Sequence, residues 1–146
     1  MRARDILEPT PSVGRDASVL DAARLVAESH APGVVVLDER GGVRAVLPAS
    51  QVMQLFVPRY VRDDPVLARV WDERHADHLA AELQSTTMED ALGERPPPPV
   101  LEPDDTLIEA AAIMAQARTP LVPVVADGRV IGVVTAQRVL AAVLGP

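Results

Sequence analysis

The chain has 146 residues, of which 48% are apolar and 24% charged, a composition typical of a soluble globular domain. Its 21 acidic and 14 basic residues give a net charge of −7, which disfavours non-specific binding to nucleic acid. Without cysteine the chain has no disulfide and no zinc–thiolate site, and without a long apolar stretch we expect no membrane insertion and a cytoplasmic location.

An internal repeat is the strongest pattern in the sequence. Residues 13–56 align with residues 101–144 after one deletion near Asp127. The alignment pairs Pro32 with Pro120, Gly41 with Gly128, and Val46 with Val133. One copy is too small to bury a good core alone, so we expect the two copies to form one unit. The expected division is residues 1–57 for the first repeat, 58–86 for an insert, and 87–146 for the second repeat.

The first copy predicts a helix, two strands and a second helix. A short segment, residues 4–7, precedes it. Ser18 is a candidate N-cap for a helix with apolar residues at helical spacing, Leu20, Ala23, Val26 and Ala27. Two β-branched runs, 34–37 and 43–47, flank a glycine-containing turn and predict a hairpin. A second helix is expected over residues 49–57.

The insert predicts one amphipathic helix over residues 65–83. Asp64 precedes Pro65, which is a good helix start. An apolar stripe at spacings of three and four follows: Leu67, Val70, Trp71, His78, Leu79 and Leu83. We expect this helix to lie on the repeats or on a partner. Asp72, His75, His78 and Glu82 have the spacing of a metal site, but solvated helix residues are the favoured interpretation.

The second copy repeats the pattern of the first. Residues 89–92 precede it, and Pro96 to Pro99 predict an extended connection. Asp105 is the candidate N-cap of a helix containing Ile108, Ala111, Met114 and Ala115. Strands are expected at 122–125 and 130–134 around Asp127-Gly128, and a helix at 136–144. The fold class is therefore α+β.

Residues 122–140, VPVVADGRVIGVVTAQRVL, closely resemble the cystathionine β-synthase type (CBS) domain, and the pair resembles a Bateman module. Matching positions are Pro123, Val124, Gly128, Gly132 and Thr135. The resemblance implies that two repeats pack their sheets about a pseudo-twofold axis and leave two clefts. In this family such clefts bind adenosine compounds, with a Thr hydroxyl and a helix N-terminus receiving phosphate and an Asp accepting from the ribose hydroxyls.

Carried over residue by residue, the resemblance gives two candidate sites. One combines Thr135 and Arg138 with Pro11, Ser12, Ala31 and Pro32, and the other combines Pro48 and Gln51 with Pro99, Val100, Thr119 and Pro120. Arg138 and Gln51 stand where the family has Asp, and Pro48 stands in place of Thr. Gln51 can still accept from a hydroxyl, whereas Arg138 cannot accept at all. Arg138 could favour a more anionic ligand, although we favour a surface role for it.

The resulting interpretation is a non-catalytic regulatory module, since no nucleophile–base pair or phosphate-binding glycine loop is evident. It would sense an adenosine-type ligand (AMP, ADP, ATP or S-adenosylmethionine) or another small anion and control a target protein such as a transporter or enzyme. The alternative is a structural adaptor with vestigial clefts. We expect a homodimer, formed through the alanine-rich helices 22–27 and 110–117. All basic residues are arginine and asparagine is absent, which indicates a GC-rich, bacterial genome.

Overall fold

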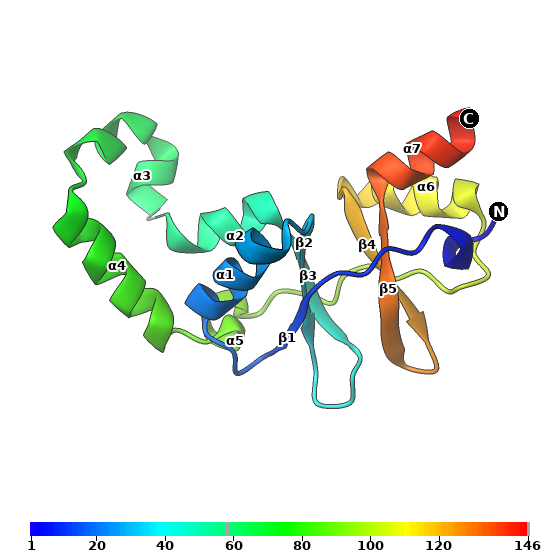
Figure 1. Ribbon diagram of the computed structural model, residues 1–146, viewed down its shortest axis with the longest axis horizontal. Coiled ribbons are helices and arrows are strands. Elements are labelled where there is room, and N and C mark those ends of the chain that lie inside the picture. Colours follow the sequence, from blue (N-terminus) through cyan, green and yellow to red (C-terminus); the bar gives the residue numbers. More distant parts are fainter. Residues whose placement is uncertain (58, 146) are drawn as a thin grey trace.

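In the computed structural model, which describes residues 1–57 and 59–145, each repeat is a small sheet with two helices packed on it (Figure 1). The first repeat contains β1 (Ser12–Gly14), α1 (Val19–Ser29), β2 (Gly33–Leu37), β3 (Val43–Pro48) and α2 (Ala49–Phe56). The second contains α6 (Leu107–Ala117), β4 (Leu121–Ala126), β5 (Arg129–Thr135) and α7 (Ala136–Leu144). The predicted helix–strand–strand–helix order and the α+β class are confirmed.

The sheets of the two repeats have matching topology. β2 and β3 are antiparallel, as are β4 and β5, and β1 lies parallel beside β2. Leu101 forms a single parallel bridge to Val124 at the place that corresponds to β1. Each hairpin forms where two β-branched runs flank a turn that contains glycine. Gly41 and Gly128 make these turns possible because they adopt positive φ angles of 83° and 78°.

The two sheets contact each other through equivalent residues. Val35, Leu121 and Val133 form a buried cluster between the repeats, with Leu37, Val43, Val46 and Val130 packed around it. Val43 corresponds to Val130 in the internal alignment, and Val46 corresponds to Val133. Since both members of each pair lie at the same contact, the repeats are related by a pseudo-twofold arrangement.

Local capping sets the start of the helices. Ser18 caps α1 as expected, its hydroxyl accepting from the Asp21 N–H at 3.0 Å. The expectation that Asp105 caps α6 is wrong. Thr106 caps that helix in a capping box with Glu109, while the Asp105 carboxylate accepts from the Glu102 N–H.

The short segments that precede the repeats are exchanged between them. η1 (Ala3–Ile6) packs into the core of the second repeat, and the Ala3 N–H donates to the Asp105 carbonyl at 2.8 Å. α5 (Met88–Leu92) packs into the core of the first repeat, and the Met88 N–H donates to the Ala17 carbonyl at 2.8 Å. Figure 1 shows the N-terminal segment running past β5 to β1. Each hydrophobic core is therefore completed by the segment that precedes the other repeat.

The insert is not the single helix over residues 65–83 that the periodicity predicts. It contains α3 (Arg59–Asp63), the 3₁₀ helix η2 (Pro65–Val70) and α4 (Glu73–Ser85). The chain leaves the helical conformation at Trp71 and Asp72, because the Asp72 carboxylate caps α4 by accepting from the His75 N–H at 3.1 Å. This backbone hydrogen bond is also the main reason why the pKa of Asp72 is lowered.

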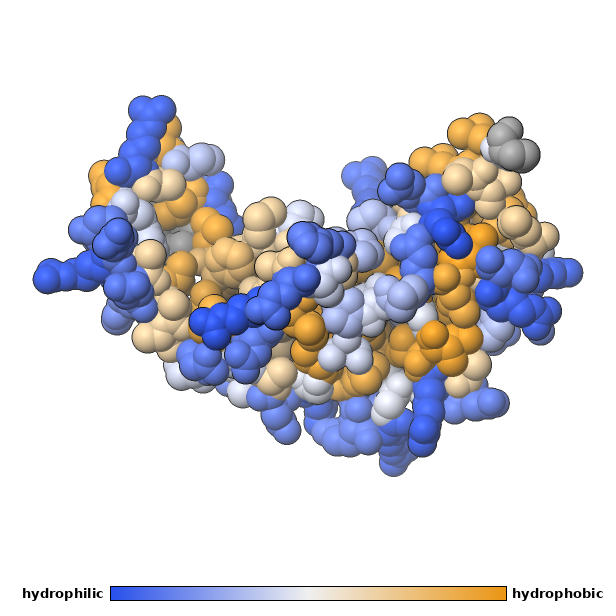
Figure 2. All heavy atoms as spheres, viewed as in Figure 1, coloured by the Kyte–Doolittle hydropathy of each residue, from blue (hydrophilic) through white to orange (hydrophobic). Residues whose placement is uncertain are grey.

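The end of the insert is packed on the body of the protein. Leu83 is buried in the first core, with Leu79 beside it, and α4 contacts α1. Val66 and Val70 are 61% and 71% exposed on η2, in the part that projects beyond the first repeat (Figures 1 and 2). Within residues 1–57 and 59–145, none of the helices combines the length and apolar character needed to cross a membrane.

Candidate ligand clefts

A cleft of about 270 Å³, here called the Gln51 cleft, lies between the repeats. Its lining includes Ala45 and Val46 of β3, Gln51 of α2, the run Arg95 to Pro99, and Thr119. The Arg95 Nη2 donates to Gln51 Oε1 at 3.1 Å, so the segment leading into the second repeat reaches the α2 residue of the first. A guanidinium therefore stands at the mouth of this cleft.

The Gln51 cleft brings together three of the residues that the sequence assigns to it, Gln51, Pro99 and Thr119. Val100 instead lines a different cavity, near the β4–β5 turn. The Pro120 carbonyl accepts from the Ala136 N–H at the start of α7, at 2.9 Å. Pro48 precedes α2 without a side-chain cap, and it can give a phosphate neither a hydroxyl nor an N–H.

The second cavity, here called the Ser12 cavity, has a volume of about 220 Å³. Its lining includes Pro9, Thr10, Ser12, Gly132 and Val133. Gly132 and Val133 correspond to Ala45 and Val46, and Pro9 lies 88 residues before Pro97, the offset of the internal alignment. The two cavities are thus equivalent positions of the duplicated fold.

Beside the Ser12 cavity, Thr135 and Arg138 both contact Glu8. The Thr135 hydroxyl caps α7 by accepting from the Arg138 N–H at 3.2 Å, and it donates to Glu8 Oε1 at 3.3 Å. Arg138 Nε lies 3.4 Å from the same carboxylate oxygen. Glu8 is held in place because its backbone pairs in both directions with Val133, at 2.8 and 3.0 Å. An anionic ligand would have to displace this carboxylate to reach Thr135 and Arg138.

The other residues assigned to this site have backbone roles near it. The Pro11 carbonyl accepts from the Val35 N–H at 3.0 Å, and the Pro32 carbonyl accepts from the Ala49 N–H at 3.0 Å. The Ala31 N–H donates to the Val26 carbonyl at 3.4 Å, at the end of α1. Of the predicted partners, Ser12 is the one seen in the lining of the cavity. Thr10 lies in the same lining, and its buried hydroxyl oxygen has no hydrogen-bond partner among the residues that the structure describes.

Sequence reasoning missed Glu8 and Arg95, which contact the two positions where the resembling family has Asp. Both residues lie in the segments before the repeats, outside the aligned copies. The signal available was the continuation of the repeat upstream, which pairs Pro9 with Pro97 and Pro11 with Pro99. That continuation marks the preceding segments as equivalent parts of the fold.

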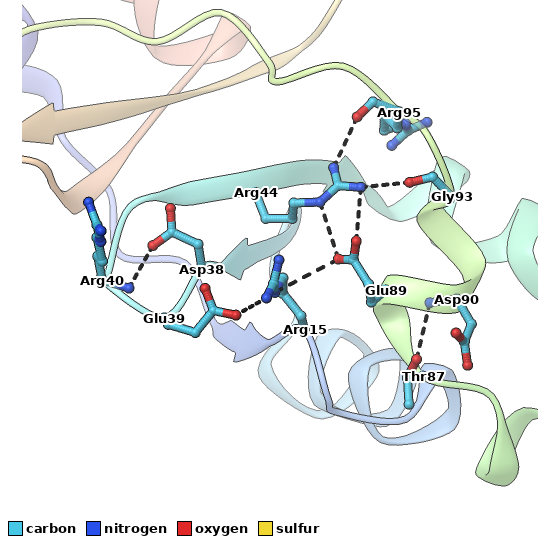
Figure 3. Close-up of polar contacts among 10 residues, drawn as sticks. All are labelled: Arg15, Asp38, Glu39, Arg40, Arg44, Thr87, Glu89, Asp90, Gly93 and Arg95. Carbon is cyan, nitrogen blue, oxygen red and sulfur yellow. Dashed lines mark hydrogen bonds and ion pairs between the residues drawn. The ribbon is translucent and has the colours of Figure 1, made fainter.

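Arg44 on β3 fastens the start of the second repeat to the first (Figure 3). Its Nε and Nη2 donate to the two carboxylate oxygens of Glu89, at 3.2 and 3.4 Å. Nη2 also donates to the Gly93 carbonyl at 2.8 Å, and Nη1 donates to the Arg95 carbonyl at 3.1 Å. Arg44 therefore fixes the backbone that carries Arg95 over the Gln51 cleft.

In the part of the chain that the structure describes, no group of three or more His, Asp or Glu side chains is arranged to hold a metal ion. Two of the residues with metal-site spacing have other contacts. Asp72 caps α4, and the centroid of the His75 ring lies 5.3 Å from that of the Trp71 ring.

The sheets of the two repeats pack against each other, and two cavities lie between the repeats. The protein is therefore an internally duplicated α+β protein with clefts between its two copies. A CBS domain model matches residues 85–145. A CBS domain-containing protein of unknown function from Kribbella flavida is 45% identical over 99% of both chains, with a TM-score of 0.82. The chain therefore belongs to the CBS domain family and is a CBS domain pair.

Two further solved structures have the same fold. The CBS domain of a CBS domain-containing membrane protein from Sphaerobacter thermophilus is 24% identical, over 96% of this chain and 86% of that one, with a TM-score of 0.75. The CBS-pair protein CBSX2 from Arabidopsis thaliana is 25% identical, over 98% and 94%, with a TM-score of 0.68. None of the curated proteins matches the chain.

Proposed function

We propose that this protein is a non-catalytic regulatory module that senses an adenosine-type or other small anionic ligand and controls a partner protein in the cytoplasm. The observation that carries this proposal is the pair of equivalent cavities between the repeats, one of which holds Gln51, Pro99 and Thr119 together. A transporter or an enzyme is the kind of target that such a module would regulate.

Proteins with the same fold support an adenosine-type ligand. CBSX2 has been solved with AMP, another CBS domain pair with 5′-methylthioadenosine and S-adenosyl-L-methionine, and the cytosolic domain of the Mg²⁺ channel MgtE with ATP. The candidate ligands for this chain are accordingly AMP, ADP, ATP and S-adenosylmethionine.

Thermal unfolding with each candidate ligand tests the proposal. A ligand that binds only the folded protein stabilises it by about 2.7 kcal/mol when present at 100 times its dissociation constant. For a chain of this size we expect the unfolding temperature to rise by roughly 5 to 10 °C with at least one adenosine compound. Guanosine and cytidine analogues serve as controls for general anion effects. No shift with any adenosine compound at millimolar concentration would contradict ligand sensing.

The second candidate function is a structural adaptor with vestigial clefts. The observation that favours it is the insert, which exposes Val66 and Val70 on the projecting η2. The replacement of both family aspartates, by Gln51 and Arg138, is consistent with clefts that no longer bind ribose. If no adenosine compound raises the unfolding temperature, this adaptor function is favoured.

We further propose a homodimer. The alanine-rich helices α1 and α6 expose residues that suit it, among them Ala27, Ala112 and Ala115. Ala22 and Ala110 face the cores and are fully buried. Several larger exposed apolar residues lie on one face of α7 and at the start of α6: Leu140, Val143, Leu144 and Ile108. Figure 2 shows apolar atoms gathered around the C-terminal helix. This face is the one that a second copy would cover.

Sedimentation at micromolar concentration should therefore show a particle of twice the 15.6 kDa chain mass. Leu140→Asp should shift the particle to the monomer, because a charge would then have to be buried in the interface. Val66→Asp, a similar change on the exposed η2, should leave the dimer intact. A wild-type monomer, or a dimer that is insensitive to Leu140→Asp, would contradict this interface.

A further inference from the structure

A third cavity, distinct from the Ser12 cavity, adjoins the Gln51 cleft and is lined by arginines. It has a volume of about 600 Å³, and its lining includes Arg15, Arg40, Arg44 and Arg95, here called the arginine cavity. Arg95 and Pro97 line both this cavity and the Gln51 cleft. The two spaces are therefore adjacent, and both reach Arg95.

The concentration of positive charge is unusual for this chain. The protein carries a net charge of −7, yet four of its 14 basic residues line this one cavity, together with only two carboxylates, Asp38 and Glu39. The cavity at the corresponding turn of the second repeat, between β4 and β5, has three acidic residues in its lining, Glu102, Asp104 and Asp127, and no basic residue. The cavity near the β2–β3 turn is thus rich in positive charge, whereas the cavity near the β4–β5 turn is rich in negative charge.

The duplicated fold does not itself require arginine at these positions, although Arg44 and Arg15 form ion pairs in the first repeat. The positions equivalent to Arg15 and Arg44 hold Pro103 and Ile131, and Leu7 lies 88 residues before Arg95. Arg40 falls at the residue that is deleted in the second copy. Because the second repeat forms the same hairpin and helices without these charges, structural need alone does not account for them.

Two of the four arginines that line the cavity pair with carboxylates, whereas for the side chains of the other two no ion pair is seen among residues 1–57 and 59–145. Arg44 is bound to Glu89, and Arg15 pairs with Glu39 and approaches Glu89 at 4.0 Å (Figure 3). Arg95 donates to the neutral amide of Gln51, and for Arg40 the contact seen is its backbone N–H to Asp38 at 2.8 Å. The side chains of Arg95 and Arg40 are therefore the groups that can bind an anion.

We propose that the arginine cavity binds the phosphate chain of a nucleoside di- or triphosphate whose nucleoside lies in the Gln51 cleft. This inference rests on the proposed sensing function. Pro48 cannot bind phosphate as the family Thr does, and the Thr135 site already holds the Glu8 carboxylate. The charge for phosphate recognition is supplied instead by Arg95, which lines both spaces, and by Arg40 along the chain of phosphates.

Calorimetric titration with adenosine, AMP, ADP and ATP tests this inference on the full chain. Affinity should rise from adenosine to ATP, and it should fall with added salt because charged contacts are screened. Arg95→Gln should weaken ATP binding by about 10- to 100-fold, the effect of losing one charge-assisted contact, and this loss should be clearly larger than the loss of adenosine affinity. Arg40→Gln should weaken ATP more than AMP. Arg24→Gln, an exposed change on α1, controls for net charge.

Each alternative outcome has a defined meaning. Inorganic triphosphate should compete with ATP, and failure to compete would overturn the placement of the phosphates in the arginine cavity. Equal affinities for adenosine and ATP, or equal losses of both in Arg95→Gln, would overturn it as well. Loss of ATP binding in Arg138→Gln, but not in Arg95→Gln, would place the phosphates at the Thr135 site. Binding of none of the four compounds would overturn this inference, and the sensing function would fall with it only if S-adenosylmethionine also fails to bind.

Discussion

Replacing Gly33 with alanine should lower the free energy of unfolding by about 3 kcal/mol, at the upper end of the range for overpacked sites. A Cβ on Gly33 would overlap the carbonyl oxygen of Leu47 and would lie 2.8 Å from Leu121 Cδ2. The Leu47 carbonyl belongs to the neighbouring strand and cannot rotate away, and Leu121 is buried between the two sheets. The strain therefore acts on the hairpin of the first repeat and on the contact between the repeats.

Gly14→Ala is the matched control for this change. Gly14 also lies in a strand of the first sheet, but a Cβ there would meet no atom within 4 Å. Its substitution should change stability by less than about 0.5 kcal/mol. For Gly33→Ala, a fall of about 10 °C in the unfolding temperature, measured by calorimetry or circular dichroism, is the expected result. Equal unfolding temperatures for the two variants would show that the chain relieves the overlap at Gly33 without cost.

The second large effect is expected for Arg44→Ala, which should lower stability by about 2 to 3 kcal/mol. Breaking a fully buried ion pair typically costs about 3 to 5 kcal/mol. The value is smaller here because the side chain of Glu89 is 39% exposed, whereas that of Arg44 is 16% exposed. The variant also leaves the carbonyls of Gly93 and Arg95 without their donor. Arg44→Lys should recover little, since an ammonium cannot make this set of contacts at once.

Arg4→Ala provides the control for Arg44→Ala. Arg4 pairs with Asp104, but their side chains are 56% and 75% exposed, so we expect a change of no more than about 1 kcal/mol. Chemical denaturation of both variants gives the comparison directly. Similar small losses in both would mean that the Arg44 contacts are exchanged for water without penalty, and that Arg95 is positioned by other groups.

The sequence predicts correctly those features that depend on neighbouring residues. The hairpins follow from β-branched runs around Gly41 and Gly128, and α7 has the bounds expected for it. The prediction of a single helix for the insert is wrong because a second capping signal, Asp72, interrupts its apolar periodicity. Asp64 and Asp72 each begin a separate helix, so hydrogen bonds from local side chains outweigh a stripe that has little to pack against.

The candidate site was only partly predictable, because its charged groups come from distant segments. The motif positions Gln51 and Arg138 were identified from the repeat, but their partners are 44 residues away in one case and 130 in the other. Neither Glu8 nor Arg95 belongs to a motif, and their roles depend on the exchange of η1 and α5 between the repeats. Only the folded chain shows that Glu8 occupies the neighbourhood of Thr135, whereas Arg95 brings positive charge to Gln51.

That exchange also sets the order in which the chain can fold during its synthesis on the ribosome. The first core needs Met88 and Leu92, so it can close before the second repeat has been made. Ala3 and Ile6 pack against residues that begin with Leu101, about 95 residues later. At roughly 5 to 20 residues per second, the N-terminal segment waits about 5 to 20 s for its partner to emerge. Ala3 and Ile6 precede both repeats in the chain and are thus among the last residues of this fold to become buried.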